Sequence, residues 1–234
     1  MTPTLDATPS LAAQEDNSKW LWFDVDDVLV ESTPLFQQSL DKWSGTVVPW
    51  QTWTHNHFHK FYGVADSDTE TLLMLRELWK KDRVLERSPL FPDVLPMFNA
   101  LREKDFSIGL LTARAWHPEG VEITQAMADD HHLPVSKIIS MDYFGTKADF
   151  LKQTGTRVEG FLDDTIRHVE GCVAAGFNSA LMHQPWNAQA THLPRITRLA
   201  DYPAWIEQAM AAKAAQAQEL ASAAPQVRRR APGV

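Results

Sequence analysis

Short apolar runs and amphipathic stretches alternate along most of this chain. The first apolar run, Trp20–Phe23, lies between polar residues, which is typical of a strand covered on both faces. From residue 91 onward, predicted helices and strands follow one another with short loops between them. The predicted strands are Phe106–Leu111, Lys137–Ser140, Val158–Leu162 and Asn178–Met182, and the predicted helices are Pro92–Lys104, Pro118–His131, Lys147–Gln153 and Thr165–Ala175. This alternation predicts an α/β, Rossmann-like fold: a parallel sheet with helices on both faces.

Residues 31–90 interrupt this alternation, because they show helical periods and no strand pattern. Within them, Ser67-Asp68-Thr69-Glu70 has the form of a capping box and predicts the start of a helix. We therefore expect a core domain formed by residues 19–30 and 91–210, with residues 31–90 inserted as a small helical cap.

Both ends of the chain differ in composition from the rest. Residues 1–18 have no apolar period and cannot bury enough surface to offset the entropy of ordering, so we expect a disordered tail. Residues 211–234 are rich in Ala and Gln before a short arginine run, which predicts a helix followed by a basic tail.

Composition narrows the function classes. The 234 residues are 44% hydrophobic, which is enough for a substantial core, and they carry a formal net charge of -8. This acidic balance argues against a nucleic-acid polymer as partner, and an anionic substrate would need local positive charge or a metal. A single cysteine, Cys172, rules out an intramolecular disulfide, and there is neither a signal-peptide pattern nor an apolar run long enough to span a membrane. We expect a cytoplasmic protein without membrane contact; its oligomeric state does not follow from the sequence.

Chemically active residues follow several of the predicted strands. Asp24 and Asp26 come directly after the first, Thr112 and Arg114 after the second, and Asp163-Asp164 after Val158–Leu162, while Lys147 begins a predicted helix. Because parallel strands end at a common edge, where ligands of open α/β sheets bind, we expect these side chains to converge.

Such a set suits phosphoryl transfer. Asp24 is the predicted nucleophile, and Asp26 the predicted acid and base for the leaving oxygen and the attacking water. The crowded carboxylates would repel a phosphate unless a hard cation joined them, so we expect Mg²⁺ to bind Asp24, Asp163 and Asp164. The Thr112 hydroxyl and the Lys147 ammonium would contact phosphoryl oxygens.

Four short motifs of this chain resemble, in order and spacing, those of the haloacid dehalogenase superfamily. They are Asp24-Val25-Asp26, Leu111-Thr112, Lys147 and Leu162-Asp163-Asp164, and the resemblance covers about residues 19–187. The resemblance implies a phosphorylated Asp24 and a metal ligand from the Asp26 backbone carbonyl. The presence of Asp26 is similar to the phosphatase branches and unlike the dehalogenases. Asp27 stands where many members have glycine, and we assign it no catalytic role.

The position of the inserted helices resembles the first type of cap in this superfamily. Met182–Asn187 also resembles the corresponding segment of 5'(3')-deoxyribonucleotidase-like members. We therefore expect a Mg²⁺-dependent phosphomonoesterase acting on a small phosphorylated metabolite, with nucleoside monophosphates as candidates. A phosphotransferase or phosphomutase, and a non-catalytic module that binds a phosphorylated ligand, remain alternatives.

Three further features have two interpretations each. The cap aromatics either face the substrate or hold the cap together; they are Phe36, Trp43, Trp50, Trp53, Phe58, Phe61 and Tyr62. Arg114 either binds a substrate anion or forms a salt bridge. The third feature is the group His55, His57 and His59. If this segment were a helix, only His55 and His59 would share a face, and no third metal ligand stands nearby in the sequence. We therefore expect these histidines to have a surface or substrate-facing role rather than to form a metal site.

Overall fold

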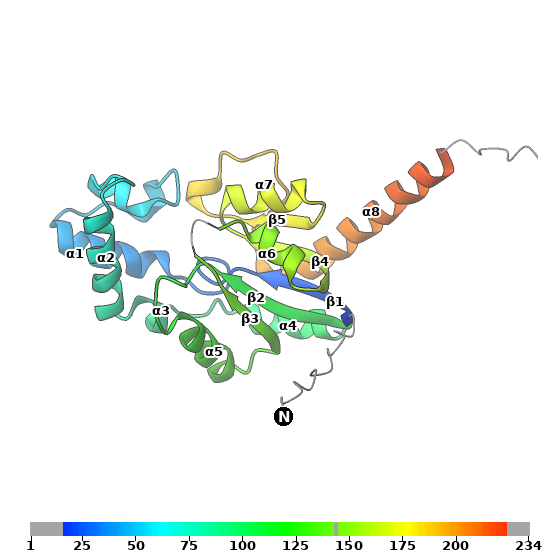
Figure 1. Ribbon diagram of the computed structural model, residues 1–234, viewed down its shortest axis with the longest axis horizontal. Coiled ribbons are helices and arrows are strands. Elements are labelled where there is room, and N and C mark those ends of the chain that lie inside the picture. Colours follow the sequence, from blue (N-terminus) through cyan, green and yellow to red (C-terminus); the bar gives the residue numbers. More distant parts are fainter. Residues whose placement is uncertain (1–15, 143–144, 224–234) are drawn as a thin grey trace, which may run out of the picture.

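The computed structural model describes residues 16–142 and 145–223 (Figure 1). At its centre lies a sheet of six strands: β1 (Asp16–Phe23), β2 (Phe106–Thr112), β3 (Val135–Ser140), β4 (Thr156–Asp163), β5 (Asn178–Met182) and β6 (Arg195–Ile196). The spatial order is β3-β2-β1-β4-β5-β6, and all five neighbouring pairs are parallel. The expected α/β, Rossmann-like class is confirmed.

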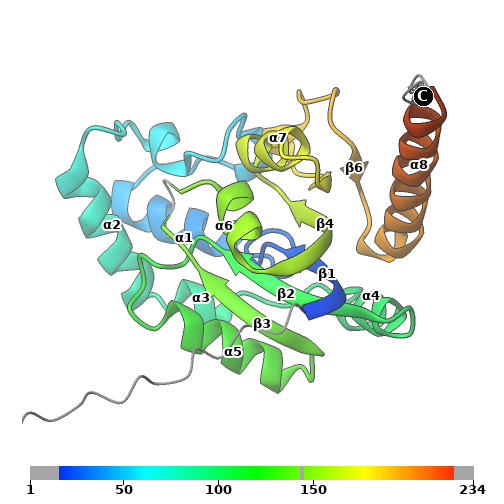
Figure 2. The ribbon, with the colours of Figure 1, turned by 45° about the vertical axis from the view of Figure 1, so that its right-hand side comes forward.

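Side chains of the central strand β1 alternate between two cores, one on each face of the sheet. Leu21 and Phe23 pack with α4 (Val94–Arg102), α5 (Gly120–Asp130) and the start of α8 (Tyr202–Ala223). Trp20 and Trp22 lie on the opposite face with α6 (Lys147–Gln153) and α7 (Ile166–Ala174). Figure 2 shows helices on both sides of the sheet. Burial on both faces explains why the first apolar run is continuous rather than alternating.

The segment between β1 and α4 forms the cap. It contains α1 (Thr33–Ser44), η1 (Trp50–Thr52), η2 (Phe58–Tyr62), α2 (Thr69–Lys81) and α3 (Val84–Arg87), and lies beside the sheet (Figure 1). The cap has its own core around Leu40, Trp53, Val64 and Leu75. Asp68, rather than Ser67, caps α2, because its carboxylate accepts a hydrogen bond from the Thr71 N–H at 3.1 Å.

Some boundaries differ from those that the sequence predicts. Strand β1 begins at Asp16, inside the predicted tail, and α8 begins at Tyr202 rather than near residue 211. The two-residue strand β6 was not predicted, because so short a strand shows no period. The rest of both predicted tails lies outside the described residues.

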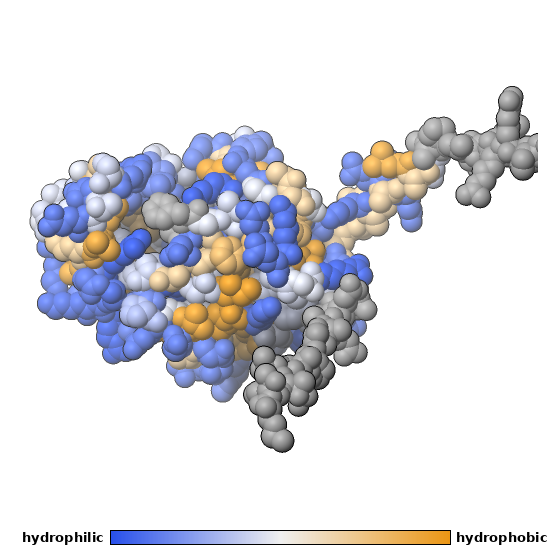
Figure 3. Space-filling view, viewed as in Figure 1, coloured by the Kyte–Doolittle hydropathy of each residue, from blue (hydrophilic) through white to orange (hydrophobic). Residues whose placement is uncertain are grey.

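Helix α8 packs on the sheet through Tyr202 and Ile206 and then extends away from the body (Figure 1). Hydrophilic and hydrophobic residues lie side by side along the extending part (Figure 3). Among the helices of the described residues, none is both long and apolar enough to cross a membrane.

Candidate active site

The strand ends gather the predicted residues around one cavity. The cavity encloses about 120 Å³, and the core residues lining it include Asp24, Asp26, Asp27, Thr112, Lys147, Asp164 and His168. The cap contributes Phe36, Asn56 and Phe58 to the same lining. Asp24 follows β1, Thr112 ends β2, and Asp163-Asp164 stand at the end of β4. The structure thus brings these side chains together at one edge of the sheet.

Lys147 is the first residue of α6, and its side chain is completely buried. Its Nζ lies 2.8 Å from Asp24 Oδ2 and 2.6 Å from Asp163 Oδ2. Burial alone would lower the pKa of Lys147, but the charges of Asp163 and Asp24 outweigh it and raise that pKa. Lys147 thus brings a fixed positive charge to the cavity.

One ammonium does not balance the carboxylates around it. Asp24, Asp163 and Asp164 each offer a carboxylate oxygen, and these oxygens lie within 4.8 Å of one another. Burial raises the pKa of Asp24 to about 6 despite the attraction of Lys147. Burial and the charges of Asp163 and Asp24 also raise the pKa of Asp164. This excess of buried negative charge on hard oxygen ligands fits a divalent cation such as Mg²⁺.

Thr112 is fully buried, and its hydroxyl oxygen has no hydrogen-bond partner among the described residues. A buried hydroxyl without a partner costs free energy, which a ligand atom in the cavity would recover. Because Thr112 lines the cavity, its hydroxyl is placed to donate to an acceptor atom of a bound ligand.

Arg114 forms the salt bridge that was the alternative to substrate binding. Its Nε and Nη2 donate to the two carboxylate oxygens of Asp26, each at 2.8 Å, and Nη1 donates to Thr124 Oγ1 at 3.0 Å. The guanidinium is 1% exposed and Arg114 is not among the cavity-lining residues. Arg114 therefore orients Asp26, and the predicted direct contact with substrate is not supported.

Asp27 has a structural role that the sequence did not reveal. Its carboxylate accepts hydrogen bonds from the backbone N–H and the hydroxyl of both Ser32 and Thr33, at the start of α1. Burial raises the pKa of Asp27 to about 7, although the bonds from Thr33 act against this. Its φ of 57° lies in the left-handed region, which explains why glycine suits this position and why the small polar Asp is tolerated.

Two residues near the clustered carboxylates were not predicted as site residues. Trp186 Nε1 donates to Asp164 Oδ2 at 2.8 Å, and Asn187 Nδ2 donates to the backbone carbonyl of Asp164, also at 2.8 Å. Both belong to the segment that prompted the nucleotidase resemblance. They fix the orientation of Asp164, and this role could be found only from the three-dimensional contacts.

The cap aromatics divide between the two interpretations. Phe36 and Phe58 line the cavity, whereas Trp53 is buried in the cap core and stacks on Phe58 and Phe61. Asn56 Nδ2 donates to Thr165 Oγ1 at 3.1 Å, which ties the cap to the loop after β4. Cap and core thus form one continuous cavity wall.

The architecture can be compared with solved structures. A haloacid dehalogenase-like family hydrolase from Streptococcus pneumoniae matches with a TM-score of 0.60 and 17% identity over 81% of this chain and 98% of that one. The chain has the haloacid dehalogenase-like fold. A predicted phosphatase from Clostridium acetobutylicum has the same fold, with a TM-score of 0.59 and 14% identity over 82% of this chain and 100% of that one.

A third structure with the haloacid dehalogenase-like fold is a predicted phosphoglycolate phosphatase from Haemophilus somnus. It matches with a TM-score of 0.56 and 16% identity over 81% of this chain and 97% of that one. No protein-family model and no curated protein matches the chain. At these identities the comparisons establish the fold alone.

Proposed function

We propose that the protein is a Mg²⁺-dependent phosphomonoesterase that works through an aspartyl-phosphate on Asp24. The observation that carries this proposal is the ion pair between the buried Asp24 carboxylate and Lys147, which lies beside two further carboxylates. The Thr112 hydroxyl, which has no hydrogen-bond partner among the described residues, lines the same cavity. Solved structures of the same fold include proteins described as phosphatases.

Each residue has a role in the proposed reaction. Asp24 attacks phosphorus while Asp26 protonates the leaving oxygen, so that an alcohol departs and an acyl phosphate forms. Asp26 then takes a proton from water, and the water oxygen attacks phosphorus. The bond between phosphorus and the Asp24 oxygen breaks, inorganic phosphate leaves, and the Asp24 carboxylate is restored. Lys147 and Thr112 stabilise the phosphoryl oxygens.

Asp24, Asp163 and Asp164 would hold Mg²⁺, with the Asp26 carbonyl as the further ligand implied by the family resemblance. When bound, the ion supplies positive charge that neutralises the phosphoryl group and the carboxylates.

The ion pair with Arg114 bears on the acid and base steps. The Arg114 guanidinium donates to both carboxylate oxygens of Asp26 and holds this side chain in place for the second step, where Asp26 accepts a proton. In the first step Asp26 must carry a proton, so we expect the pair to loosen when substrate binds.

The proposed substrate is a small phosphorylated metabolite from the cytoplasm, rather than a nucleic-acid polymer or a membrane lipid. The cavity of about 120 Å³ supports a small ligand, and the cap residues Phe36 and Phe58 could contact an apolar or aromatic group on it. Nucleoside monophosphates are therefore candidate substrates.

The test is a screen of phosphorylated metabolites, including 5'- and 3'-nucleotides, with Mg²⁺. Asp24→Asn should abolish turnover with the fold intact, whereas Asp130→Asn, at an exposed position on α5, should not. An active Asp24→Asn variant would refute the assignment, and nucleotides no better than sugar phosphates would refute the nucleotide preference.

A phosphotransferase remains the second candidate, because a Thermotoga maritima protein provisionally assigned as a beta-phosphoglucomutase shares the fold with a TM-score of 0.57. Product analysis with competing acceptors separates the two, since a hydrolase releases only inorganic phosphate. No turnover across the panel, despite bound Mg²⁺, would favour a non-catalytic binding module.

A further inference from the structure

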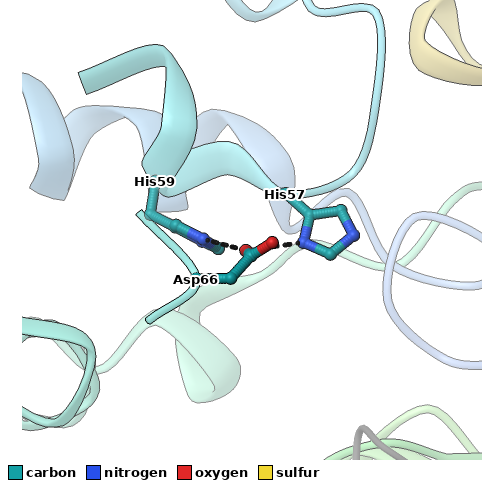
Figure 4. A group of neighbouring side chains, drawn as sticks. All are labelled: His57, His59 and Asp66. Atoms are coloured by element: carbon teal, nitrogen blue, oxygen red, sulfur yellow. Dashed lines mark hydrogen bonds and ion pairs between the residues drawn. The ribbon is translucent and has the colours of Figure 1, made fainter. Parts of the chain in front are cut away.

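The cap carries a second group of residues of the types that ligate metal ions: His57, His59 and Asp66. His57 Nδ1 lies 3.1 Å from Asp66 Oδ1, and His59 Nε2 lies 2.8 Å from the same oxygen. Figure 4 shows both imidazoles directed at the carboxylate. We propose that this cluster is a binding site for a divalent transition metal ion of the Zn²⁺ class.

The local backbone explains why the sequence did not predict this cluster. His57 precedes the 3-10 helix η2, so the spacing of a continuous α-helix does not apply, and His57 joins His59 in place of His55. After η2, Gly63 adopts a φ of 79° and turns the chain, and Asp66 follows three residues later. The turn thus supplies the third ligand that the sequence pattern lacked.

The geometry suits a tetrahedral ion after a small adjustment. One donor atom from each residue lies within 4.8 Å of the other two. Ligand distances of about 2.0–2.2 Å around a tetrahedral zinc place neighbouring donor atoms roughly 3.4 Å apart. To reach this spacing, the N–O separations of 3.1 Å and 2.8 Å need to grow by about 0.3 Å and 0.6 Å. Asp66 is 52% exposed, so water can reach the site and complete the coordination.

The donor set separates this site from the carboxylates of the catalytic cavity. Two imidazoles and one carboxylate suit Zn²⁺ and its neighbours in the periodic table, whereas Mg²⁺ prefers oxygen ligands and rarely binds imidazole. Millimolar Mg²⁺ can therefore occupy the catalytic carboxylates in an experiment without filling the cap site.

Lys60 modulates the site. Its Nζ lies 2.5 Å from Asp66 Oδ2, so it neutralises one carboxylate oxygen while the other faces the two imidazoles. An ammonium this close to the cluster repels an incoming cation. Removing this positive charge should strengthen metal binding.

The site lies next to cavity-lining residues in the sequence. Asn56 and Phe58, which flank His57, line the catalytic cavity, and Asn56 also contacts Thr165 of the core. A metal ion that joins His57 and His59 to Asp66 would therefore fix the segment that presents Asn56 and Phe58 to the cavity.

The experiment is a titration of the full chain with Zn²⁺ in millimolar Mg²⁺, followed by calorimetry and by equilibrium dialysis. We expect one equivalent of Zn²⁺ to bind, and His59→Gln or Asp66→Asn to weaken binding by at least about tenfold. His131→Gln, at an exposed histidine outside the cluster, and Asp163→Asn, in the carboxylate group beside the catalytic cavity, should bind Zn²⁺ as the wild type does. Lys60→Gln should bind it more tightly.

Substitution of Co²⁺ for Zn²⁺ gives a readout that depends on the ligands. We expect a visible absorption band that disappears in His59→Gln, while circular dichroism shows that this variant is folded. The proposal is overturned if the wild type binds no Zn²⁺ in the presence of Mg²⁺, if His59→Gln binds it equally well, or if Asp163→Asn abolishes binding.

Discussion

The pair formed by Arg114 and Asp26 allows a quantitative test of the site geometry. Arg114→Met removes the guanidinium while keeping much of the side-chain volume. Both Asp26 oxygens then lose a hydrogen bond of 2.8 Å. Hydrogen bonds to charged groups contribute about 1.5–3 kcal/mol each, so the two bonds together amount to roughly 3–6 kcal/mol. The Asp26 side chain is 26% exposed, so hydrogen bonds from water replace part of the lost free energy when Arg114 is absent.

The coupling free energy between the two side chains should therefore be about 2–4 kcal/mol. The assay is a double-mutant cycle of Arg114→Met, Asp26→Asn and the double variant, with free energies of unfolding from urea denaturation. Arg198→Met, at an exposed arginine, is the control and should change stability by less than about 0.5 kcal/mol. A coupling energy near zero would refute the buried ion pair.

Kinetics of Arg114→Met distinguish the two interpretations of this arginine. If Arg114 positions Asp26, the variant should have a lower kcat and a KM close to that of the wild type, because the affected step is proton transfer. If Arg114 instead bound substrate, KM would rise. A raised KM with unchanged kcat would contradict the positioning role.

Two further predictions concern residues around the cavity. Trp186→Phe removes the hydrogen bond to Asp164 Oδ2, so the Mg²⁺ concentration needed for half-maximal activity should rise about 10–100-fold, and an unchanged requirement would count against this role. Burial lowers the pKa of His168 in the folded state to about 3. As the pH falls below about 6.5, the His168 imidazole therefore takes up a proton in the unfolded chain but not in the folded one, and the free energy of unfolding decreases. Between pH 7.5 and pH 5 the wild type should lose about 2 kcal/mol more than His168→Gln in urea denaturation; equal losses would show that His168 is not buried in its neutral form.

The core elements could be predicted from local patterns, because each strand buried on both faces leaves an apolar run of its own. The bounds of α6 and β5 agree with the predicted Lys147–Gln153 and Asn178–Met182. Spacing also identified the carboxylates at the strand ends, because the end of a strand is visible in the sequence. Strand β6 was missed because two residues show no periodicity.

Contacts that no local pattern reveals include two that join residues far apart in the sequence. Arg114 meets Asp26 across 88 positions, and Trp186 meets Asp164 across 22. Asp66 joins the two histidines only because η2 is a short 3-10 helix followed by a turn at Gly63. Such pairings depend on how elements pack, and no local pattern of apolar and polar residues encodes them.

The central claim is that Asp24 is the nucleophile, and trapping the intermediate tests it directly. The protein is mixed with a phosphomonoester substrate and Mg²⁺, quenched in acid, and treated with borohydride, which reduces an acyl phosphate to an alcohol. We predict that mass spectrometry finds the reduced side chain at position 24. Reduction at another aspartate, or none in a protein that turns over substrate, would contradict the account.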